Sequence, residues 1–353
     1  MAKAIADVFQ PVDEDGDSYQ RMRAKGIEVI VPDEAWASAA NRRERSEVMF
    51  DSDADIGVGI SSRSKDLTRA SLENSPNLRA IAFYTVGYDN VDMDAATEIG
   101  ILITHSPTEP NWAGVAEGTF AFILTMLKQV REKDRHVKEG GWRDMKLAGT
   151  YIGPRLDGYA GITLGIIGLG RIGGRLADLF QPWRIKILAC DPYVDESKFV
   201  HHNATPVDME TLLRESDVVT THCNLTKETT NLIGAKELGQ MKSSAILVNA
   251  ARGPIVDVDA LFDALEADQI AGAALDVLPE EPPDPQSPIL GLGDKVLLSP
   301  HMITANHGTG LGHAIPWVED VVYAVLKGEV PDHVVNEDAL PKWLERFGGK
   351  RLI

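Results

Sequence analysis

A glycine-rich turn between an apolar strand pattern and a helical pattern constrains this chain more than any other feature of its sequence. Residues 162–167 form a continuous apolar run, which is typical of a parallel strand buried on both faces. The turn Gly168-Leu169-Gly170-Arg171-Ile172-Gly173 follows at once, and apolar residues then recur at helical spacing as far as Pro182. This order predicts a βαβ unit whose turn lies at the carboxyl end of a strand.

Strand and helix patterns continue to alternate after this turn, which predicts a parallel, doubly wound sheet. Residues 1–100 show the same alternation of strand and helix patterns without the glycine turn. They therefore predict a second, smaller α/β domain. Helical patterns occupy residues 209–213 and 259–265. The predicted strands are residues 4–9, 27–31, 56–60, 78–83, 162–167, 185–190, 217–221, 245–249, 271–277 and 296–299.

Two segments predict how the domains are connected. Residues 107–112 are polar and proline-rich, and an apolar segment at residues 115–130 then predicts a helix that leads into the second domain. Residues 317–326 predict a helix that ends before Gly328, and we expect this tail to return to the first domain. The predicted domains are therefore residues 1–112 with 306–353, and residues 113–305.

Composition narrows the functional class. The chain has 353 residues with 35 Lys and Arg against 53 Asp and Glu, a formal net charge of −18, which argues against a nucleic-acid surface. No apolar run approaches the roughly 18 residues that a membrane span needs. The acidic residue Asp7 comes before an apolar signal-peptide core could form, which argues against a signal peptide. The two cysteines have no metal-ligand spacing, so we expect no metal site and a cytoplasmic enzyme.

The glycine turn predicts a dinucleotide site. Gly168 permits the tight turn, Gly170 lets the backbone approach a pyrophosphate, and Gly173 allows the helix to pack closely on the strand. Asp191 comes 18 residues after Gly173 at the end of the next predicted strand. Its carboxylate can accept hydrogen bonds from ribose hydroxyls and would repel a 2′-phosphate, which favours NAD over NADP.

Five ordered motifs resemble those of the D-isomer-specific 2-hydroxyacid dehydrogenase family, which contains D-lactate, D-glycerate and D-3-phosphoglycerate dehydrogenases. The resemblance covers nearly the whole chain. It implies two Rossmann-like α/β domains: a doubly wound parallel-sheet NAD-binding domain and a smaller flavodoxin-like substrate domain. The motifs are Gly168–Gly173, Asn249-Ala250-Ala251-Arg252-Gly253, Ala274-Leu275-Asp276-Val277, Glu281-Pro282 and Ser299-Pro300-His301.

The resemblance implies hydride transfer between nicotinamide and a small D-2-hydroxy or 2-oxo acid. Arg252 would bind the substrate carboxylate and polarise the 2-oxo group. His301 would act as general acid and base, and Glu281 would orient its imidazole and raise its pKa. The first domain would add the backbone amides of Val86 and Gly87 opposite Arg252.

Further binding residues follow from the same resemblance. The stretch from His222 to Thr226 resembles the loop beneath the adenosine, although Asn224 stands where the family commonly has proline. Arg63 could contact a second anionic group or be a solvated surface charge. The cofactor-binding residues predicted in this way are Gly168, Gly170, Arg171, Ile172, Gly173, Asp191, Cys223, Asn224, Thr229, Ala250, Ala251 and Asp276, the last near the nicotinamide carboxamide.

Several alternatives stay open at this point. Residues 302–306 and 106–112 depart from the commonest family forms, and Pro-Thr-Glu-Pro at residues 107–110 is similar to phosphite dehydrogenases of the family. Trp112 and Trp317 could narrow the substrate pocket, or they could pack in an interface or in the core. A corepressor-like, NAD-sensing binding protein on the same fold is a second functional class. The apolar helix at residues 115–130 predicts a homodimer through the NAD-binding domain.

Overall fold

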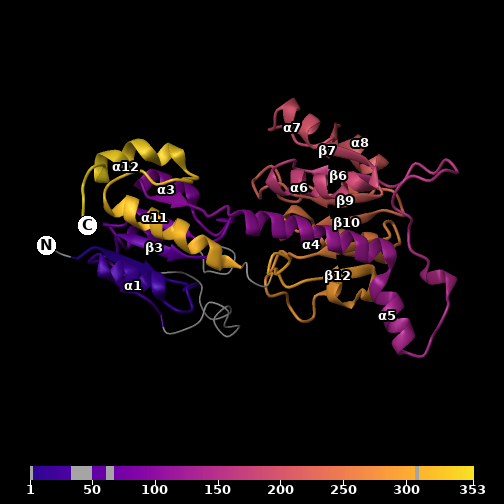
Figure 1. Ribbon diagram of the computed structural model, residues 1–353, viewed down its shortest axis with the longest axis horizontal. Coiled ribbons are helices and arrows are strands. Elements are labelled where there is room, and N and C mark those ends of the chain that lie inside the picture. Colours follow the sequence, from indigo (N-terminus) through magenta and orange to yellow (C-terminus); the bar gives the residue numbers. More distant parts are fainter. Residues whose placement is uncertain (1–2, 33–49, 61–66, 307–309) are drawn as a thin grey trace. The chain divides into compact units, whose positions relative to one another are not determined.

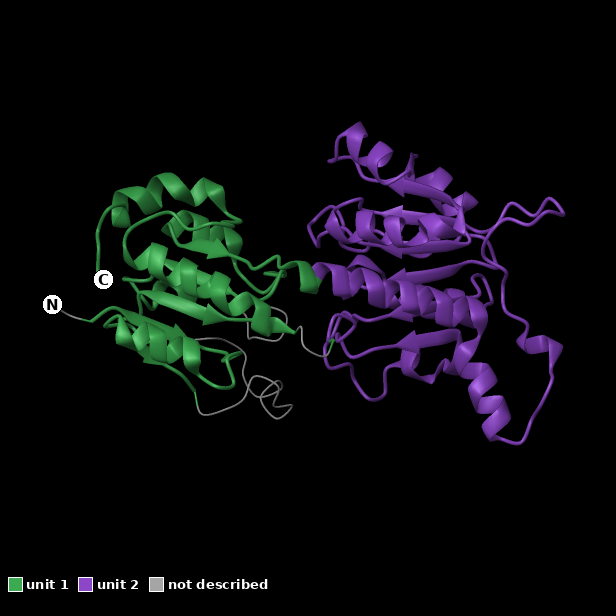
Figure 2. Cartoon of the chain, in the orientation of Figure 1, with its two compact units in different colours: residues 1–111, 306–353 green, residues 112–305 purple. Residues whose placement is uncertain are grey.

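The structure is a computed structural model that describes residues 3–32, 50–60, 67–306 and 310–353. It divides into two compact units, as Figure 2 shows. The first unit comprises Met1–Asn111 and Asn306–Ile353, and the second comprises Trp112–Ala305.

The first unit is built on a parallel sheet with the strand order β2-β1-β3-β4-β5. Figure 1 labels its central strand, β3. This strand order is the flavodoxin-like order, so the predicted fold of this part is confirmed. The four strands predicted here are present, and β5 is an addition. The strands are β1 (Ile5–Val8), β2 (Glu28–Ile30), β3 (Ile56–Gly59), β4 (Ala80–Phe83) and β5 (Leu102–Thr104).

Helices cover both faces of this sheet because its strands are apolar on both sides. One core contains side chains of α1 (Asp17–Ala24), α11 (Ile315–Leu326) and α12 (Leu340–Phe347). The other contains side chains of α2 (Arg69–Glu73) and α3 (Met93–Ile99). The C-terminal segment is therefore part of this unit, and its Trp343 is fully buried with its indole N–H donating to the Arg79 carbonyl at 2.8 Å.

The second unit has a seven-stranded parallel sheet in the order β12-β11-β10-β9-β6-β7-β8. The chain direction across the sheet reverses between β6 and β9, which is the switch point where doubly wound sheets bind ligands. The six strands predicted here are present, and β8 is an addition. The strands are β6 (Thr163–Ile167), β7 (Lys186–Cys190), β8 (Thr205–Pro206), β9 (Val218–Thr221), β10 (Ile246–Asn249), β11 (Gly272–Leu275) and β12 (Val296–Leu298).

Two hydrophobic cores lie on the two faces of this sheet. On one face pack α4 (Glu109–Lys128), α6 (Arg171–Phe180) and α7 (Glu196–His201). On the other pack α8 (Met209–Glu215), α9 (Ala235–Leu238) and α10 (Val258–Glu266). The arrangement is the predicted doubly wound sheet, and it leaves the carboxyl strand ends at one edge.

The long helix differs from its prediction at both ends. It begins at Glu109, inside the stretch expected to be a polar connection, because Pro110 is compatible with the first helical turn. It ends at Lys128, where Gln129 takes a left-handed φ of 51°, and a separate helix α5 (Val130–Lys138) follows. Trp112 therefore lies on α4 rather than in a loop.

Candidate functional site

The glycine turn between β6 and α6 has the geometry that a dinucleotide requires. Gly168 has a φ of 93°, which favours glycine. A Cβ on Gly173 would stand 2.1 Å from the Gly168 carbonyl oxygen, so helix and turn pack in direct backbone contact. A Cβ on Gly170 would meet no atom within 4 Å. The space beside Gly170 is open where the pyrophosphate of a dinucleotide would approach.

The N-terminus of α6 points its amides into the same region. Gly170 is the N-cap and supplies no side-chain hydrogen bond to the first turn. Unsatisfied first-turn amides and the helix dipole together favour an anionic group. Arg171 is exposed and Ile172 is half-buried at the start of this helix. Backbone and charge therefore fit a bound dinucleotide here.

Asp191 lies at the end of β7 and is tied to the glycine turn. Its Oδ2 accepts a hydrogen bond from the Leu169 amide at 2.8 Å, and its Oδ1 accepts one from the Tyr193 amide at 3.0 Å. Each carboxylate oxygen has a second lone pair with which to accept from a ribose hydroxyl. The structure thus brings Asp191 and the glycines together, as the sequence suggested.

The loop after β9 lies directly against the glycine turn, since a Cβ on Gly168 would stand 2.7 Å from the Cys223 amide nitrogen. Burial raises the pKa of the Cys223 thiol to about 11, so it is neutral at pH 7. Thr229 braces this loop: its hydroxyl donates to the Asn224 carbonyl at 2.6 Å and accepts from the Thr226 amide at 2.8 Å. Contacts of Cys223, Asn224 and Thr229 with a cofactor remain predictions.

His222, in the same loop, was not singled out as a functional residue. Its Nε2 lies 3.0 Å from the Thr220 hydroxyl, and its Nδ1 is among the buried polar atoms without a partner in the described part of the chain. Burial lowers the pKa of His222 to about 3, so the ring is neutral. A single histidine has no recognisable spacing, and only the fold shows that the His222 backbone lies against Gly168.

Arg252 follows β10, at the carboxyl edge of the sheet. Asn249 shapes this loop because its Oδ1 accepts from the Ala251 amide at 3.1 Å and its Nδ2 donates to the Arg252 carbonyl at 2.8 Å. The Arg252 guanidinium donates to the Ala251 carbonyl at 2.7 Å. Ala250 and Ala251 are buried. Sequence reasoning missed the shaping role of Asn249, although it stands in the quoted motif.

His301 and Glu281 form a hydrogen-bonded pair. His301 Nδ1 lies 2.7 Å from Glu281 Oε2, and the two side chains are 22% and 28% exposed. The other carboxylate oxygen of Glu281 accepts from the Leu278 amide at 3.1 Å. With both oxygens engaged, the carboxylate holds the imidazole in one orientation. The pairing that the sequence suggested across 20 residues is present in the structure.

Asp276 anchors the segment that carries His301. Its side chain is 2% exposed, and its Oδ1 accepts from the amides of Met302 at 3.0 Å and Ile303 at 3.1 Å. Its carbonyl accepts from the His301 amide at 2.8 Å. His301 itself has a φ of 55°, a left-handed conformation that is uncommon for a residue with a side chain. Three hydrogen bonds to one buried residue therefore stabilise this backbone, a role the sequence did not reveal.

The predicted substrate loop lies in the first unit, where β4 is followed by Val86 and Gly87. His105 Nδ1 lies 3.0 Å from the Val86 carbonyl, and the Thr85 hydroxyl donates to the Gly87 carbonyl at 3.0 Å. Both carbonyls are thus engaged within the unit, which orders the loop. Arg63 lies outside the described residues.

Trp317 packs within the first unit. Its indole stacks on the His333 ring with a centroid separation of 4.6 Å and an interplanar angle of 14°. It is 36% exposed. The structure gives this side chain a packing partner, which was one of the two interpretations left open.

Two kinds of feature are absent from the described residues. No group of three or more His, Cys, Asp or Glu there could hold a metal ion. No helix in the same part of the chain is long and apolar enough to cross a membrane.

Comparisons with known proteins agree with this geometry. Residues 120–302 match the sequence model described as D-isomer specific 2-hydroxyacid dehydrogenase, NAD binding domain. This match covers the glycine turn, Arg252, Glu281 and His301, and it confirms NAD as the predicted cofactor.

Matches to individual proteins cover a larger part of the chain. The D-3-phosphoglycerate dehydrogenase of Archaeoglobus fulgidus is 35% identical over 89% of this chain, and the match spans only 56% of that longer protein. The glyoxylate reductase of Korarchaeum cryptofilum is 40% identical over 76% of this chain and 79% of its own length.

A solved structure shows the same fold. The D-lactate dehydrogenase of Aquifex aeolicus, complexed with NAD and lactic acid, aligns with a TM-score of 0.77 at 28% identity. The alignment covers 92% of this chain and 96% of that one.

Proposed function

The chain belongs to the D-isomer specific 2-hydroxyacid dehydrogenase family, as an NAD-dependent dehydrogenase or reductase, and we propose that its substrate is a small D-2-hydroxy or 2-oxo acid. The observation that carries this proposal is the 2.7 Å contact between His301 and Glu281 in the same unit as the glycine turn and Arg252. Glyoxylate is the first substrate to test, because five of the similar relatives are named glyoxylate reductases.

Each side chain has a defined part in the proposed reaction. When bound, NAD supplies or accepts the hydride. The guanidinium of Arg252 binds the substrate carboxylate and polarises the carbonyl oxygen at C2. In reduction His301 donates the proton from Nε2 to that oxygen, and in oxidation it removes the hydroxyl proton. Glu281 accepts from Nδ1–H throughout, so it keeps the imidazole ring oriented with Nε2 free to exchange the proton.

The test is a panel of 2-oxo acids, beginning with glyoxylate and hydroxypyruvate, with NADH or NADPH and with turnover followed at the nicotinamide absorbance. We expect turnover of at least one small 2-oxo acid and a preference for NADH, because Asp191 would repel a 2′-phosphate. No turnover of any acid in the panel would contradict the proposed substrate class. A strong preference for NADPH would contradict the role given to Asp191.

We also propose that the protein is a homodimer through its second unit. Residues 139–162 follow α5 as a segment of loops and turns, with one short 3-10 helix (Met145–Leu147), and it carries large exposed apolar side chains. Trp142 is 73% exposed, Met145 is 85% exposed and Leu156 is fully exposed. Exposed apolar side chains gathered on one segment are typical of an association surface, and a second copy of this chain would bury them.

A further inference from the structure

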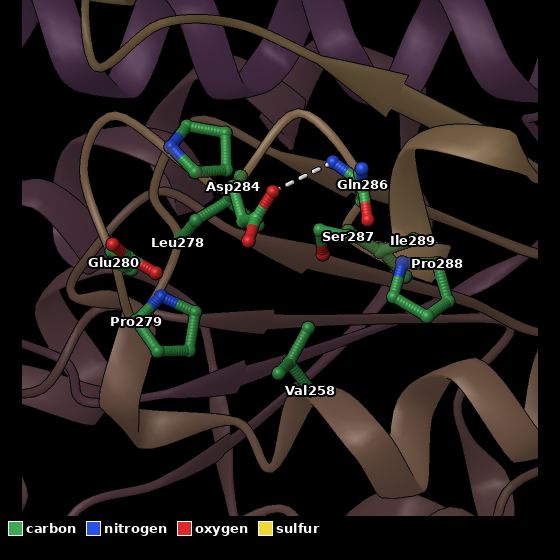
Figure 3. A pocket seen from close by; sticks show the side chains of 10 residues that line it. Val258, Leu278, Pro279, Glu280, Asp284, Gln286, Ser287, Pro288 and Ile289 are labelled. Atoms are coloured by element: carbon green, nitrogen blue, oxygen red, sulfur yellow. Dashed lines mark hydrogen bonds between the residues drawn. The ribbon is translucent and has the colours of Figure 1, made fainter.

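A pocket with a volume of about 390 Å³ lies in the second unit, beside the turn that carries Glu281. Neither Glu281 nor His301 lines it, so it is separate from the proposed reaction site. Its volume is within the range of about 300–1,000 Å³ that small-molecule sites occupy. The lining residues, most of them labelled in Figure 3, are Val258, Leu278, Pro279, Glu280, Pro283, Asp284, Gln286, Ser287, Pro288 and Ile289.

The pocket is preformed by its covalent and hydrogen-bonded walls. Pro279, Pro283 and Pro288 fix the backbone on three parts of its rim. The Asp284 carboxylate accepts from the Gln286 amide at 2.8 Å (Figure 3). The Asp284 carbonyl accepts from the Ser287 amide at 2.8 Å. A ligand would therefore meet walls that are already ordered, which lowers the entropic cost of binding.

The interior of the pocket is apolar while its charged groups are acidic. Val258 and Leu278 are half-buried, and Ile289, at 2% exposed, belongs to the core beneath them. Glu280 and Asp284 are exposed carboxylates at the rim, and no Lys or Arg is among the lining residues. An apolar surface with carboxylates beside it is complementary to a cation that has an apolar body.

We propose that this pocket binds a small organic cation of the alkylammonium or arylammonium class. The ammonium group lies between Glu280 and Asp284, where it can donate to the carboxylates and to the Ser287 hydroxyl. The hydrocarbon group contacts Val258, Leu278 and the proline rings. The negative net charge of the chain adds a long-range attraction for such a ligand.

The pocket is compatible with the proposed homodimer. Its lining residues pack with α10 on one face of the sheet, whereas α4 packs on the other. An association through α4 would therefore leave the face that carries the pocket accessible to a ligand.

Benzylammonium chloride is the probe, titrated into the full-length protein and followed by calorimetry, with benzyl alcohol and benzoate as neutral and anionic analogues. For a ligand of this size we expect a Kd of about 1–10 mM. Glu280→Gln and Asp284→Asn should each weaken binding about two- to five-fold, since each removes one exposed charge partner. The matched controls Glu266→Gln and Asp263→Asn remove exposed charges on α10, away from the pocket rim, and should leave the Kd unchanged.

Two further arms locate the ligand. Ser287→Trp should block binding by filling the pocket, with an unchanged Tm showing that the protein remains folded, and saturating NADH should not displace the probe. The proposal is overturned if benzyl alcohol binds as tightly as benzylammonium, if the two rim variants bind like the wild type, or if NADH competes. Because none of these readouts is turnover, failure here is distinct from failure of the proposed reaction.

Discussion

At the scale of single residues, the candidate site depends on polar partners as much as on the groups that would react. The imidazole of His301 is held by Glu281 at 2.7 Å. The buried carboxylate of Asp276 holds the amides of the two residues that follow His301. Arg252 stands on a loop that Asn249 shapes through two hydrogen bonds. Pre-organisation of this kind places the acid–base and anion-binding groups before a substrate arrives.

Replacing His301 tests the assignment of the proton donor. We expect His301→Gln to lower kcat about 10²- to 10⁴-fold, since the amide cannot transfer a proton. NADH affinity should stay at the wild-type value, because the glycine turn and Asp191 are unchanged. The measurement is steady-state turnover of the best 2-oxo acid, with NADH binding followed by fluorescence.

The control is His201→Gln, which changes an exposed histidine on α7 and should keep wild-type kcat. Near-full turnover by the His301 variant would remove this residue from the mechanism.

His222 predicts a pH dependence of stability. Burial lowers the pKa of folded His222 to about 3, whereas an unfolded histidine titrates near 6.5. As the pH falls through about 6.5, the unfolded chain binds a proton that the folded ring does not, so the stability decreases down to about pH 3. We expect His222→Gln to reduce this slope by up to about 1.4 kcal/mol per pH unit.

The measurement is the free energy of unfolding in urea at several pH values between 7 and 5. The exposed His201→Gln is again the matched control and should keep the wild-type slope. Identical slopes for the wild type and the His222 variant would contradict the predicted neutral, buried imidazole.

At the scale of elements, the turn between β6 and α6 combines two different uses of glycine. Gly173 allows the backbone of α6 to pack against the Gly168 carbonyl, which a Cβ would approach to 2.1 Å. A Cβ on Gly170 would instead meet no atom within 4 Å. Gly173 is therefore required by the packing of the fold, whereas Gly170 is required by the approach of a ligand.

A pair of alanine variants separates these two uses. Gly173→Ala should lower the free energy of unfolding by about 1–3 kcal/mol, as overpacked sites do, and should weaken NADH binding because the turn must open. Gly170→Ala should keep the stability within about 0.5 kcal/mol of wild type and weaken NADH binding alone.

Urea unfolding and NADH titration of both variants give the comparison. Equal loss of stability in the two variants would show that the turn needs both glycines for packing. Unchanged NADH affinity of Gly170→Ala would place the pyrophosphate elsewhere.

At the scale of the whole molecule, each unit has its own parallel sheet and its own pair of hydrophobic cores. The C-terminal segment completes the first unit through α11, α12 and the buried Trp343. The described part of the second unit leaves Trp142, Met145 and Leu156 exposed, although buried side chains dominate the rest of its apolar residues. This contrast is the basis for the proposed homodimer.

Sedimentation equilibrium tests the homodimer. We expect the wild type to have twice the mass of one chain at micromolar concentration. The double variant Met145→Asp with Leu156→Asp should dissociate to single chains, because burial of a carboxylate in an apolar interface is unfavourable.

Tyr193→Ser is the matched control: it removes an apolar ring that is 77% exposed near Asp191 and should leave the mass unchanged. A wild-type protein that sediments as single chains would contradict the homodimer.

Much of the fold followed from local sequence patterns. Apolar runs such as residues 162–167 and helical spacing after Gly173 are sufficient to recognise a parallel α/β sheet, because burial on both faces leaves a signal in every strand. Two strands were not predicted: β5, which has three residues, and β8, which has two. The boundary of α4 was also misplaced, since proline in a first helical turn reads as a loop signal.

The sequence by itself determined the parallel α/β architecture, the dinucleotide turn and the identity of Arg252, Glu281 and His301 as candidates, because each depends on residue type and order along the chain. Only the tertiary structure decided that His301 Nδ1 meets Glu281, that the buried Asp276 holds the His301 backbone and that the His222 imidazole is buried and neutral. The pocket beside the Glu281 turn is likewise a product of the tertiary structure. These features depend on distances between residues that are far apart in sequence, and those distances arise when the strand ends converge at one edge of the sheet.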